Sequence, residues 1–382
     1  MLGAFATLGA LTVGVVADGW AAFGARPRGA RQERVERSPQ WGRGGFENPQ
    51  PVRGEFLRNI GGVLFPSPFA VAEPNAVPID TGLPARLRLP PASGLRVSWL
   101  GHSTLLIEID GQRYLTDPVW SLRTSPVQWA GPKRFYAPPA TLDEVGPLDG
   151  VLISHDHYDH LDHATVQRPA ADGVPFFVPL GVGAHLEAWG VPNAQIIELD
   201  WWGEVERPGA TGAMRLALTP ARHASGRINP QSNHTLWGGW ALVGPRHRAF
   251  YSGDTGLFPA LDEIGTKYGP FDVTMMESGA YNQAWPDWHM GPEQAVRAHQ
   301  MVRGGVMIPV HWGLFNLASH AWTEPAERVR LEAERRGVRL AVPKPGASVE
   351  PAQLGPLEVW WPALPVRTAA EDPIVSRGVD PG

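Results

Sequence analysis

The sequence predicts an α/β fold built in layers, with one domain behind an N-terminal extension. From Arg96 onward, short apolar runs bounded by turn residues alternate with stretches that carry the polar and apolar faces of helices. Runs of strand character come first and are then mixed with helices, an order typical of layered α/β domains. With 382 residues, the chain is long enough to bury a substantial core.

Seven apolar runs are predicted as strands and two later stretches as helices. The expected strands cover residues 96–100, 104–109, 113–116, 150–154, 215–219, 249–252 and 306–310. Asp110-Gly111 separates the second and third runs and indicates a β-hairpin. Residues 292–303 and 324–336 combine a polar face with some alanine, so they are predicted as helices.

Four segments are expected along the chain. They are an apolar N-terminal segment over residues 1–25, an extension over 26–95, the main domain over 96–349 and a C-terminal tail over 350–382. The extension is rich in Pro, Gly and Arg, which favours an extended arm that wraps the core or a partly disordered lead-in. The end of the tail is expected to fray.

The N-terminal apolar segment leaves the compartment open. It is short for a membrane span unless Asp18 is tolerated near one end. It also lacks the positively charged start of a secretory signal, since no Lys or Arg precedes Arg26. If the segment is an anchor, the arginines that follow it would keep the chain in the cytoplasm, at the inner face of the membrane. A buried or amphipathic helix explains the segment equally well, and export through a signal is a further alternative.

Composition narrows the classes of partner and of metal site. With 33 Lys and Arg against 38 Asp and Glu, the net charge is −5, so nucleic acid is not expected as a partner. The chain has no cysteine, and any metal ion must therefore be held by His, Asp or Glu. The 16 Trp outnumber the 13 Phe, which favours tryptophan packing in the core, with an apolar pocket or interface as the alternative.

The densest group of potential metal ligands is the string His-Asp-His-Tyr-Asp-His at positions 155–160, directly after a predicted strand. Neutral imidazole and carboxylate groups suit zinc and related ions. His223, Asp254 and His311 each follow a predicted strand as well. Because strand ends gather at one rim of a layered α/β fold, we expect these side chains to meet. A surface loop that collects histidines by chance is disfavoured, since the chain has only 13.

These motifs resemble the metallo-β-lactamase superfamily. The string His-x-His-x-Asp-His, the later His223, the Ser-Gly-Asp-Thr around Asp254 and the strand-terminal His311 carry the resemblance. It implies an αββα sandwich, with a single catalytic domain and a two-metal centre. Five further strings are similar to the N-acylphosphatidylethanolamine-hydrolysing phospholipase D family and its bacterial relatives. They are Trp-Leu-Gly-His-Ser-Thr from position 99, Leu-Thr-Asp-Pro from 115, Gly-Pro-Lys-Arg from 131, Gly-Ala-Tyr from 279 and Ile-Pro-Val-His-Trp-Gly from 308.

The resemblance, which covers residues 96–342, also implies a set of metal ligands. One metal ion would be held by His155, His157 and His223. The other would be held by Asp159, His160 and His311, and Asp254 would bridge the two. Two zinc ions per chain are expected, although iron or manganese also fits His and carboxylate ligands. The resemblance further implies a homodimer.

Other site residues are assigned on weaker signals. Asp159 and Asp254 are expected to act in catalysis, together with His289, which resembles a family position near the substrate and could protonate the leaving group. Asp117 is interpreted as a carboxylate that orients a metal-binding His, with a turn cap as the alternative. His102 is expected either to line the mouth of the site or to bond the backbone of a tight turn.

The expected function is that of a dinuclear zinc hydrolase, a phosphodiesterase of the phospholipase D type that acts on N-acylphosphatidylethanolamine or a related lipid. Two metal ions can neutralise a phosphodiester and supply a nucleophile near neutral pH. A lactonase or another phosphoesterase on the same fold is the alternative, because fold does not determine chemistry. A non-catalytic, metal-stabilised binding protein at a membrane is the alternative of another class. The complete ligand set disfavours it.

Four tryptophans close in sequence to His289 and His311 bear on the substrate. They are Trp285, Trp288, Trp312 and Trp322. If they face the metal ions, they would form an apolar wall for acyl chains, and if they face inward they belong to the core.

Overall fold

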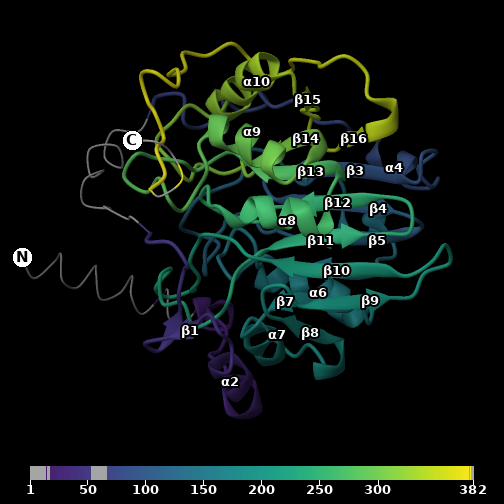
Figure 1. Ribbon diagram of the computed structural model, residues 1–382, viewed down its shortest axis with the longest axis vertical. Helices are drawn as coiled ribbons and strands as arrows, with labels where there is room; N and C mark the ends of the chain where they lie inside the picture. Colours follow the sequence, from purple (N-terminus) through teal and green to yellow (C-terminus); the bar gives the residue numbers. More distant parts are fainter. Residues whose placement is uncertain (1–13, 15–17, 53–66, 378, 380–382) are drawn as a thin grey trace, which may run out of the picture.

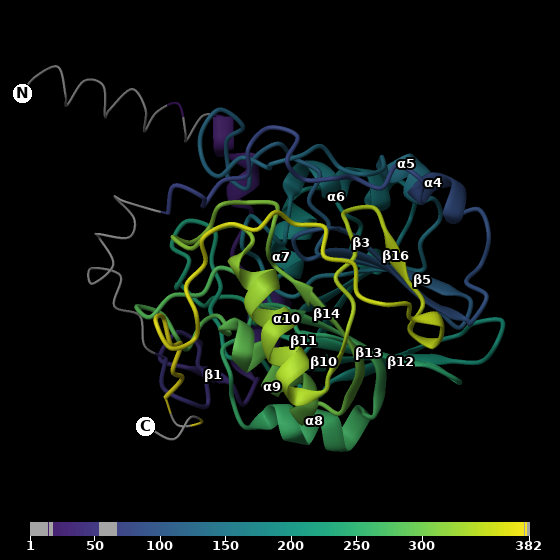
Figure 2. The same cartoon turned by 90° about the horizontal axis from the view of Figure 1, so that it is seen from above.

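The computed structural model describes residues 14, 18–52, 67–377 and 379 of the chain (Figure 1). Two seven-stranded sheets lie face to face, and helices cover the outer face of each (Figure 2). The αββα sandwich that the resemblance implied is therefore confirmed. Its two sheets are large because the antiparallel part of each continues into a parallel part, as described below.

The first sheet has the strand order β16-β3-β4-β5-β6-β7-β8. Its strands are β3 (Leu95–Gly101), β4 (Thr104–Ile109), β5 (Gln112–Thr116), β6 (Gly150–Leu152), β7 (Phe176–Pro179), β8 (Ile196–Leu199) and β16 (Ser348–Val349). The predicted hairpin joins β4 to β5, with φ of 50° at Asp110 and 82° at Gly111, as tight hairpin turns require. From β5 onward the strands are parallel. The segments between them hold α5 (Leu142–Val145), α6 (His163–Ala171) and α7 (Gly183–Ala188).

The second sheet has the strand order β15-β14-β13-β12-β11-β10-β9. Its strands are β9 (Glu204–Arg207), β10 (Met214–Thr219), β11 (Gly239–Val243), β12 (Arg248–Tyr251), β13 (Phe271–Glu277), β14 (Gly304–Val310) and β15 (Arg339–Leu340). Strands β9 to β12 are antiparallel and β12 to β15 are parallel. The parallel part is covered by α8 (Ala260–Tyr268), α9 (Pro292–Met301) and α10 (Glu324–Arg336).

The main core lies between the sheets and extends under these last three helices. Trp99, Trp237 and Trp240 are among its largest fully buried side chains, which agrees with the interpretation of most tryptophan as core. Trp240 comes from the second sheet, and its indole nitrogen donates to the carbonyl of Ile153 at 2.9 Å, which ties that sheet to the chain just after β6. Burying one such side chain contributes about 1.5–3 kcal/mol or more of hydrophobic stabilisation.

All seven predicted strands and both predicted helices are present, with ends that differ by no more than two residues. The other seven strands of the two sheets were not predicted. Two of these strands show why the sequence does not predict them. The edge strand β9 reads Glu-Val-Glu-Arg, and β13 contains charged residues at its second and last positions. Such segments lack a strong apolar run, so they become strands because a neighbour pairs with their backbone.

The described part of the N-terminal extension packs on the domain. It contains the short 3-10 helix η1 (Ala21–Phe23), the helix α2 (Gly29–Glu36), the hairpin of β1 (Trp41–Gly42) and β2 (Gly45–Phe46), and the helix α4 (Leu83–Arg86). Arg31 on α2 pairs with Glu198 on β8 at 3.0 Å, and Phe46 is buried in the main core. The described residues of the extension therefore pack on the domain, as expected of an arm that wraps the core.

The predicted apolar anchor, signal or helix lies almost wholly outside the described residues. Within the described ranges, no helix is both long enough and apolar enough to cross a bilayer. The C-terminal tail packs where it is described, and the ring of Trp360 stacks on Trp312 with centroids 5.5 Å apart.

Candidate metal centre

The predicted ligands lie on loops that leave the carboxyl ends of the strands. The string 155–160 follows β6, and His311 follows β14 directly. His223 comes after β10 and Asp254 after β12. Because β6 belongs to one sheet and the other three strands to the second, the site forms where the two sheets meet at this edge. The structure brings all seven predicted ligands together.

The first group consists of three imidazoles. His155 Nε2 lies 2.9 Å from His157 Nδ1, and His223 Nε2 lies 3.4 Å from the same atom. Their outer nitrogens are held by other groups: His157 Nε2 contacts the carbonyl of Pro230 at 3.1 Å, and His223 Nδ1 contacts that of Trp288 at 2.9 Å. The three inner nitrogens are therefore left to face one another, as the ligands of one metal ion would.

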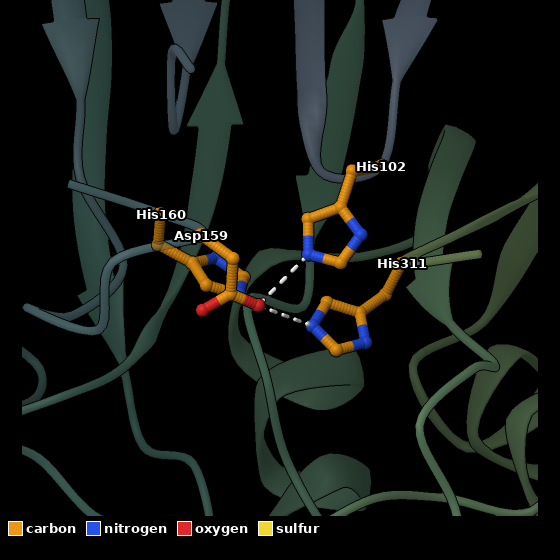
Figure 3. A group of neighbouring side chains, drawn as sticks. All are labelled: His102, Asp159, His160 and His311. Atoms are coloured by element: carbon orange, nitrogen blue, oxygen red, sulfur yellow. Dashed lines mark hydrogen bonds and ion pairs between the residues drawn. The ribbon is translucent and has the colours of Figure 1, made fainter. Parts of the chain in front are cut away.

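The second group surrounds Asp159 (Figure 3). Asp159 Oδ2 lies 3.3 Å from both His160 Nε2 and His311 Nε2. The same oxygen is 2.9 Å from Nε2 of His102, which comes from the turn between β3 and β4. His102 is therefore part of this group, where its buried ring contacts a predicted ligand directly.

Asp254 lies between the two groups. Its Oδ2 is 3.1 Å from Nε2 of both His160 and His311 in the second group. It is also 3.8 Å from His155 Nε2 and 3.7 Å from His223 Nε2 in the first. One carboxylate oxygen thus faces nitrogens from both groups, which is the placement that a bridging ligand needs.

Buried polar atoms without hydrogen-bond partners indicate that the site fits metal ions. Within the part of the chain that the structure describes, these include His160 Nε2, His311 Nε2 and Asp254 Oδ1. Buried polar atoms are rarely left unpaired, because desolvation without a partner is costly. Nitrogen and oxygen donors of this kind suit zinc, iron or manganese, so the residues present fit the implied metal ions.

Electrostatics within the cluster favour an ionised Asp254 beside neutral His155 and His223. Burial opposes protonation of His160 and His311, but the neighbouring carboxylates outweigh it and raise the pKa of His160 well above its usual range and that of His311 to about 10. Burial opposes ionisation of Asp254, but His160 and His311 outweigh it and hold the pKa of this carboxyl well below its usual range. Burial, reinforced by neighbouring imidazoles, lowers the pKa of His155 well below the usual value for histidine. Burial also lowers the pKa of His223, against the opposing charge of Asp254. Metal ions bind these two forms, the carboxylate and the neutral imidazole.

Asp117 contacts a predicted metal-binding histidine, as expected of a carboxylate that orients such a ring. Its Oδ2 accepts from His160 Nδ1 at 2.7 Å and from the hydroxyl of Tyr251, and its Oδ1 accepts from the backbone N–H of Ser154 at 2.7 Å. The carboxylate lies directly after β5 and is fully buried. It therefore orients the ring of His160 so that Nε2 faces Asp254.

Three site residues lie in the left-handed region of backbone conformation. The φ angles are 52° at His102, 34° at Asp117 and 67° at His311. Each residue lies where a strand ends, so the unusual backbone turns its side chain from the sheet toward the cluster. Non-glycine residues there cost about 1–3 kcal/mol each, which the surrounding packing must offset.

The sequence did not reveal the role of Glu277. This carboxylate ends β13 and is fully buried. Its Oε2 lies 2.9 Å from His289 Nδ1, and its Oε1 accepts from the backbone N–H of Met290 at 2.8 Å. Burial raises the pKa of Glu277, although His289 opposes the shift. A carboxylate at a strand end is the same signal that located Asp254, but β13 itself was not predicted.

Asp156 lies inside the ligand string but serves another purpose. Its carboxylate accepts from the backbone N–H of Gly226 at 2.6 Å, from Thr235 Oγ1 at 2.9 Å and from His185 Nε2 at 3.0 Å. It therefore ties the ligand loop to the loop after β10.

Comparisons with known proteins agree with this geometry. Residues 112–312 match the family model described as "Beta-lactamase superfamily domain", which is more than half of the chain. The chain belongs to the metallo-β-lactamase superfamily. It is a metal-dependent hydrolase of that superfamily by its family match, its relatives and its His and Asp clusters.

Two relatives and one solved structure illustrate the similarity. An uncharacterized protein of Mycobacterium tuberculosis is 48% identical over 335 residues, which cover 85% of this chain and 88% of the relative. An N-acyl-phosphatidylethanolamine-hydrolyzing phospholipase D of Caenorhabditis elegans is 36% identical over 247 residues, covering 62% and 69%. The structure of Igni18, a metallo hydrolase from Ignicoccus hospitalis, has a TM-score of 0.52 and 25% identity, and covers 67% of this chain and 97% of that one.

In this superfamily member, a cavity opens onto the candidate metal centre. It is lined by His157, Asp159, Asp254, Ala280, Trp285, Trp288, His289, His311 and Leu317. The structure thus divides the four tryptophans close to His289 and His311. Trp285 and Trp288 line the cavity, whereas Trp312 and Trp322 belong to the main core. Both expected placements, an apolar wall at the site and a position in the core, therefore occur among these four side chains.

Replacing Glu277 by Gln is expected to lower kcat more than it changes KM. The amide keeps the size of the side chain but loses the charge that holds His289 Nδ1. We expect a fall of about tenfold, in the range typical for loss of an outer contact in a metal site. Steady-state kinetics of hydrolysis measure the effect, with Glu263→Gln on the surface of α8 as the matched control. Unchanged kcat would show that His289 does not depend on this contact.

Proposed function

We propose that this hydrolase is a phosphodiesterase of the phospholipase D type, which cleaves N-acylphosphatidylethanolamine or a related N-acylated phospholipid. The observation that carries the proposal is that one oxygen of Asp254, Oδ2, faces both groups of imidazoles in a cavity that also has apolar lining. The C. elegans relative is named for the same activity.

The geometry supports the ligand assignment that the resemblance implies. One ion would be held by His155, His157 and His223, and the other by Asp159, His160 and His311, with Asp254 shared. Zinc is the proposed metal. When bound, a pair of such ions neutralises the charge of a phosphodiester and activates water near neutral pH.

The chain's own residues supply the remaining requirements of hydrolysis. Water attacks phosphorus, and the P–O bond to the ethanolamine oxygen breaks. That oxygen must take up a proton, and His289 lines the cavity where it leaves. Because Glu277 engages Nδ1 of His289, Nε2 is the ring atom that remains to face the substrate and to hold the proton.

The cavity walls account for the preference for a lipid. Trp285 and Trp288 lie beside the ligands and would contact an acyl chain, and Ala280 and Leu317 complete the apolar lining. Aromatic walls of this kind also exclude water from the reacting centre, which strengthens the electrostatic interactions within it.

A panel of substrates tests the proposal. Protein purified without chelator is analysed for metal content and assayed on N-acylphosphatidylethanolamine, an unacylated phospholipid, a simple aryl phosphodiester and a lactone. We expect two zinc ions per chain and release of N-acylethanolamine, detected by mass spectrometry, with the largest kcat/KM on the N-acylated lipid. Turnover of the lactone alone would establish the lactonase alternative. Bound metal without turnover of any ester would refute an enzymatic role.

A further inference from the structure

A short piece of the N-terminal extension lies on the loop that carries His223. This strap, residues 45–51, contacts the loop at both ends. The backbone N–H of Phe46 donates to the carbonyl of Asn233 at 2.7 Å, and Asn233 Nδ2 donates to the carbonyl of Phe46 at 3.2 Å. At the other end, the guanidinium of Arg222 donates to the carbonyl of Pro51. The strap is therefore held on both sides of Asn48.

Asn48 binds the backbone of His223 at two points. Its Oδ1 accepts from the N–H of His223 at 3.1 Å, and its Nδ2 donates to the carbonyl of the same residue at 2.7 Å. One side-chain amide offers both a donor and an acceptor, so it can pair with the two polar backbone groups of a single residue. A carboxylate of the same size has two acceptors and no donor, and a hydroxyl has only one oxygen for both roles, so neither offers this donor and acceptor side by side.

Regular structure does not fix the loop, so side-chain contacts hold it in place: Asp156 binds it farther along at Gly226, and Asn48 binds it at His223. Residues 220–238 lie between β10 and β11 and belong to neither a helix nor a strand. The carbonyl of Trp288 sets the orientation of the His223 ring through Nδ1. That contact orients the ring only if the backbone from which the ring projects is itself held in place.

We propose that Asn48 is a positioning residue for the metal-binding group of His155, His157 and His223, and that the N-terminal extension is part of the metal centre. The proposal rests on the assignment of His223 as a metal ligand under the proposed function. Metal ligands must be held within a fraction of an ångström of their required positions, and contacts outside the ligand set provide this precision. Asn48 provides it from a segment 175 residues away in sequence.

The variant Asn48→Asp tests the proposal with little change in size. The carboxylate retains an acceptor for the N–H of His223 but places an oxygen opposite its carbonyl. Zinc affinity is measured by competition with a chromogenic chelator, and metal content by mass spectrometry. We expect one of the two ions to bind at least about tenfold more weakly, as is typical for lost outer contacts, while the other is retained. Asn48→Ala is measured in parallel.

Two controls separate the possible causes. Asn193→Asp introduces the same charge at an asparagine that contacts Arg31 instead of the metal centre, and it should bind both ions as the unchanged protein does. Thermal unfolding of each variant in chelator reports on the fold alone, and we expect it to be unchanged in Asn48→Asp. Weakened binding of both ions together with lower stability of the metal-free protein would overturn the proposal, because the strap would then act on the fold as a whole.

The variant His223→Ala distinguishes failure of this inference from failure of the proposed function. If His223→Ala loses one ion while Asn48→Asp keeps both at full affinity, the role of Asn48 is refuted and the ligand assignment stands. If His223→Ala also keeps both ions, the ligand assignment itself is wrong, and the role of Asn48 falls with it.

Discussion

Asp254→Asn is expected to abolish hydrolysis and to weaken binding of both metal ions. The substitution preserves the shape of a buried side chain whose Oδ2 lies within 3.8 Å of four imidazole nitrogens, two from each group. It removes the negative charge that would be shared between the ions. We expect kcat/KM to fall by more than about 10³-fold, which corresponds to about 4 kcal/mol of transition-state stabilisation.

Metal analysis and steady-state kinetics on the same preparation measure this effect. Asp262→Asn, on the exposed face of α8, removes an equal charge outside the site and should leave both readings unchanged. A variant at position 254 that binds two ions and retains most of its activity would remove Asp254 from the bridge.

His157→Ala is expected to remove one metal ion and nearly all activity while leaving the fold intact. The side chain is partly exposed at the cavity, and its Nδ1 faces both His155 and His223. Because direct ligands contribute more than the outer contacts whose loss costs 10–100-fold, we expect activity to fall by more than about 10²-fold. The second group would retain Asp159, His160 and His311.

The nearby His163 provides a matched control for this variant. It begins α6, close to the ligand string, and packs against Trp189 instead of the candidate metal centre. His163→Ala should therefore keep both metal ions and full activity. Circular dichroism of both variants checks the fold. If His157→Ala retained two ions and normal turnover, the first group would have to be reassigned.

The position of the site explains why so many of its residues could be predicted. Strands that run in the same direction bring their carboxyl ends to one edge of the sheet, so side chains just beyond those ends lie close together there. His223, Asp254 and His311 each follow a recognisable apolar strand, so spacing along the chain predicts their convergence. The string at 155–160 needed no tertiary information, because its ligands are neighbours in sequence.

The sequence by itself determined the layered α/β class, the strands of strong apolar character and the seven side chains that meet at the candidate metal centre. Only the tertiary structure decided which groups hold those side chains in place. Glu277 contacts Nδ1 of His289, and Asn48 forms two hydrogen bonds to the backbone of His223; such contacts leave no periodic pattern in the chain. The tertiary structure also decided which tryptophans line the cavity and which lie in the core. Trp288 and Trp312 are both large apolar side chains close to site residues, and only the packing of two sheets and a distant tail sends one to the cavity and the other to the core.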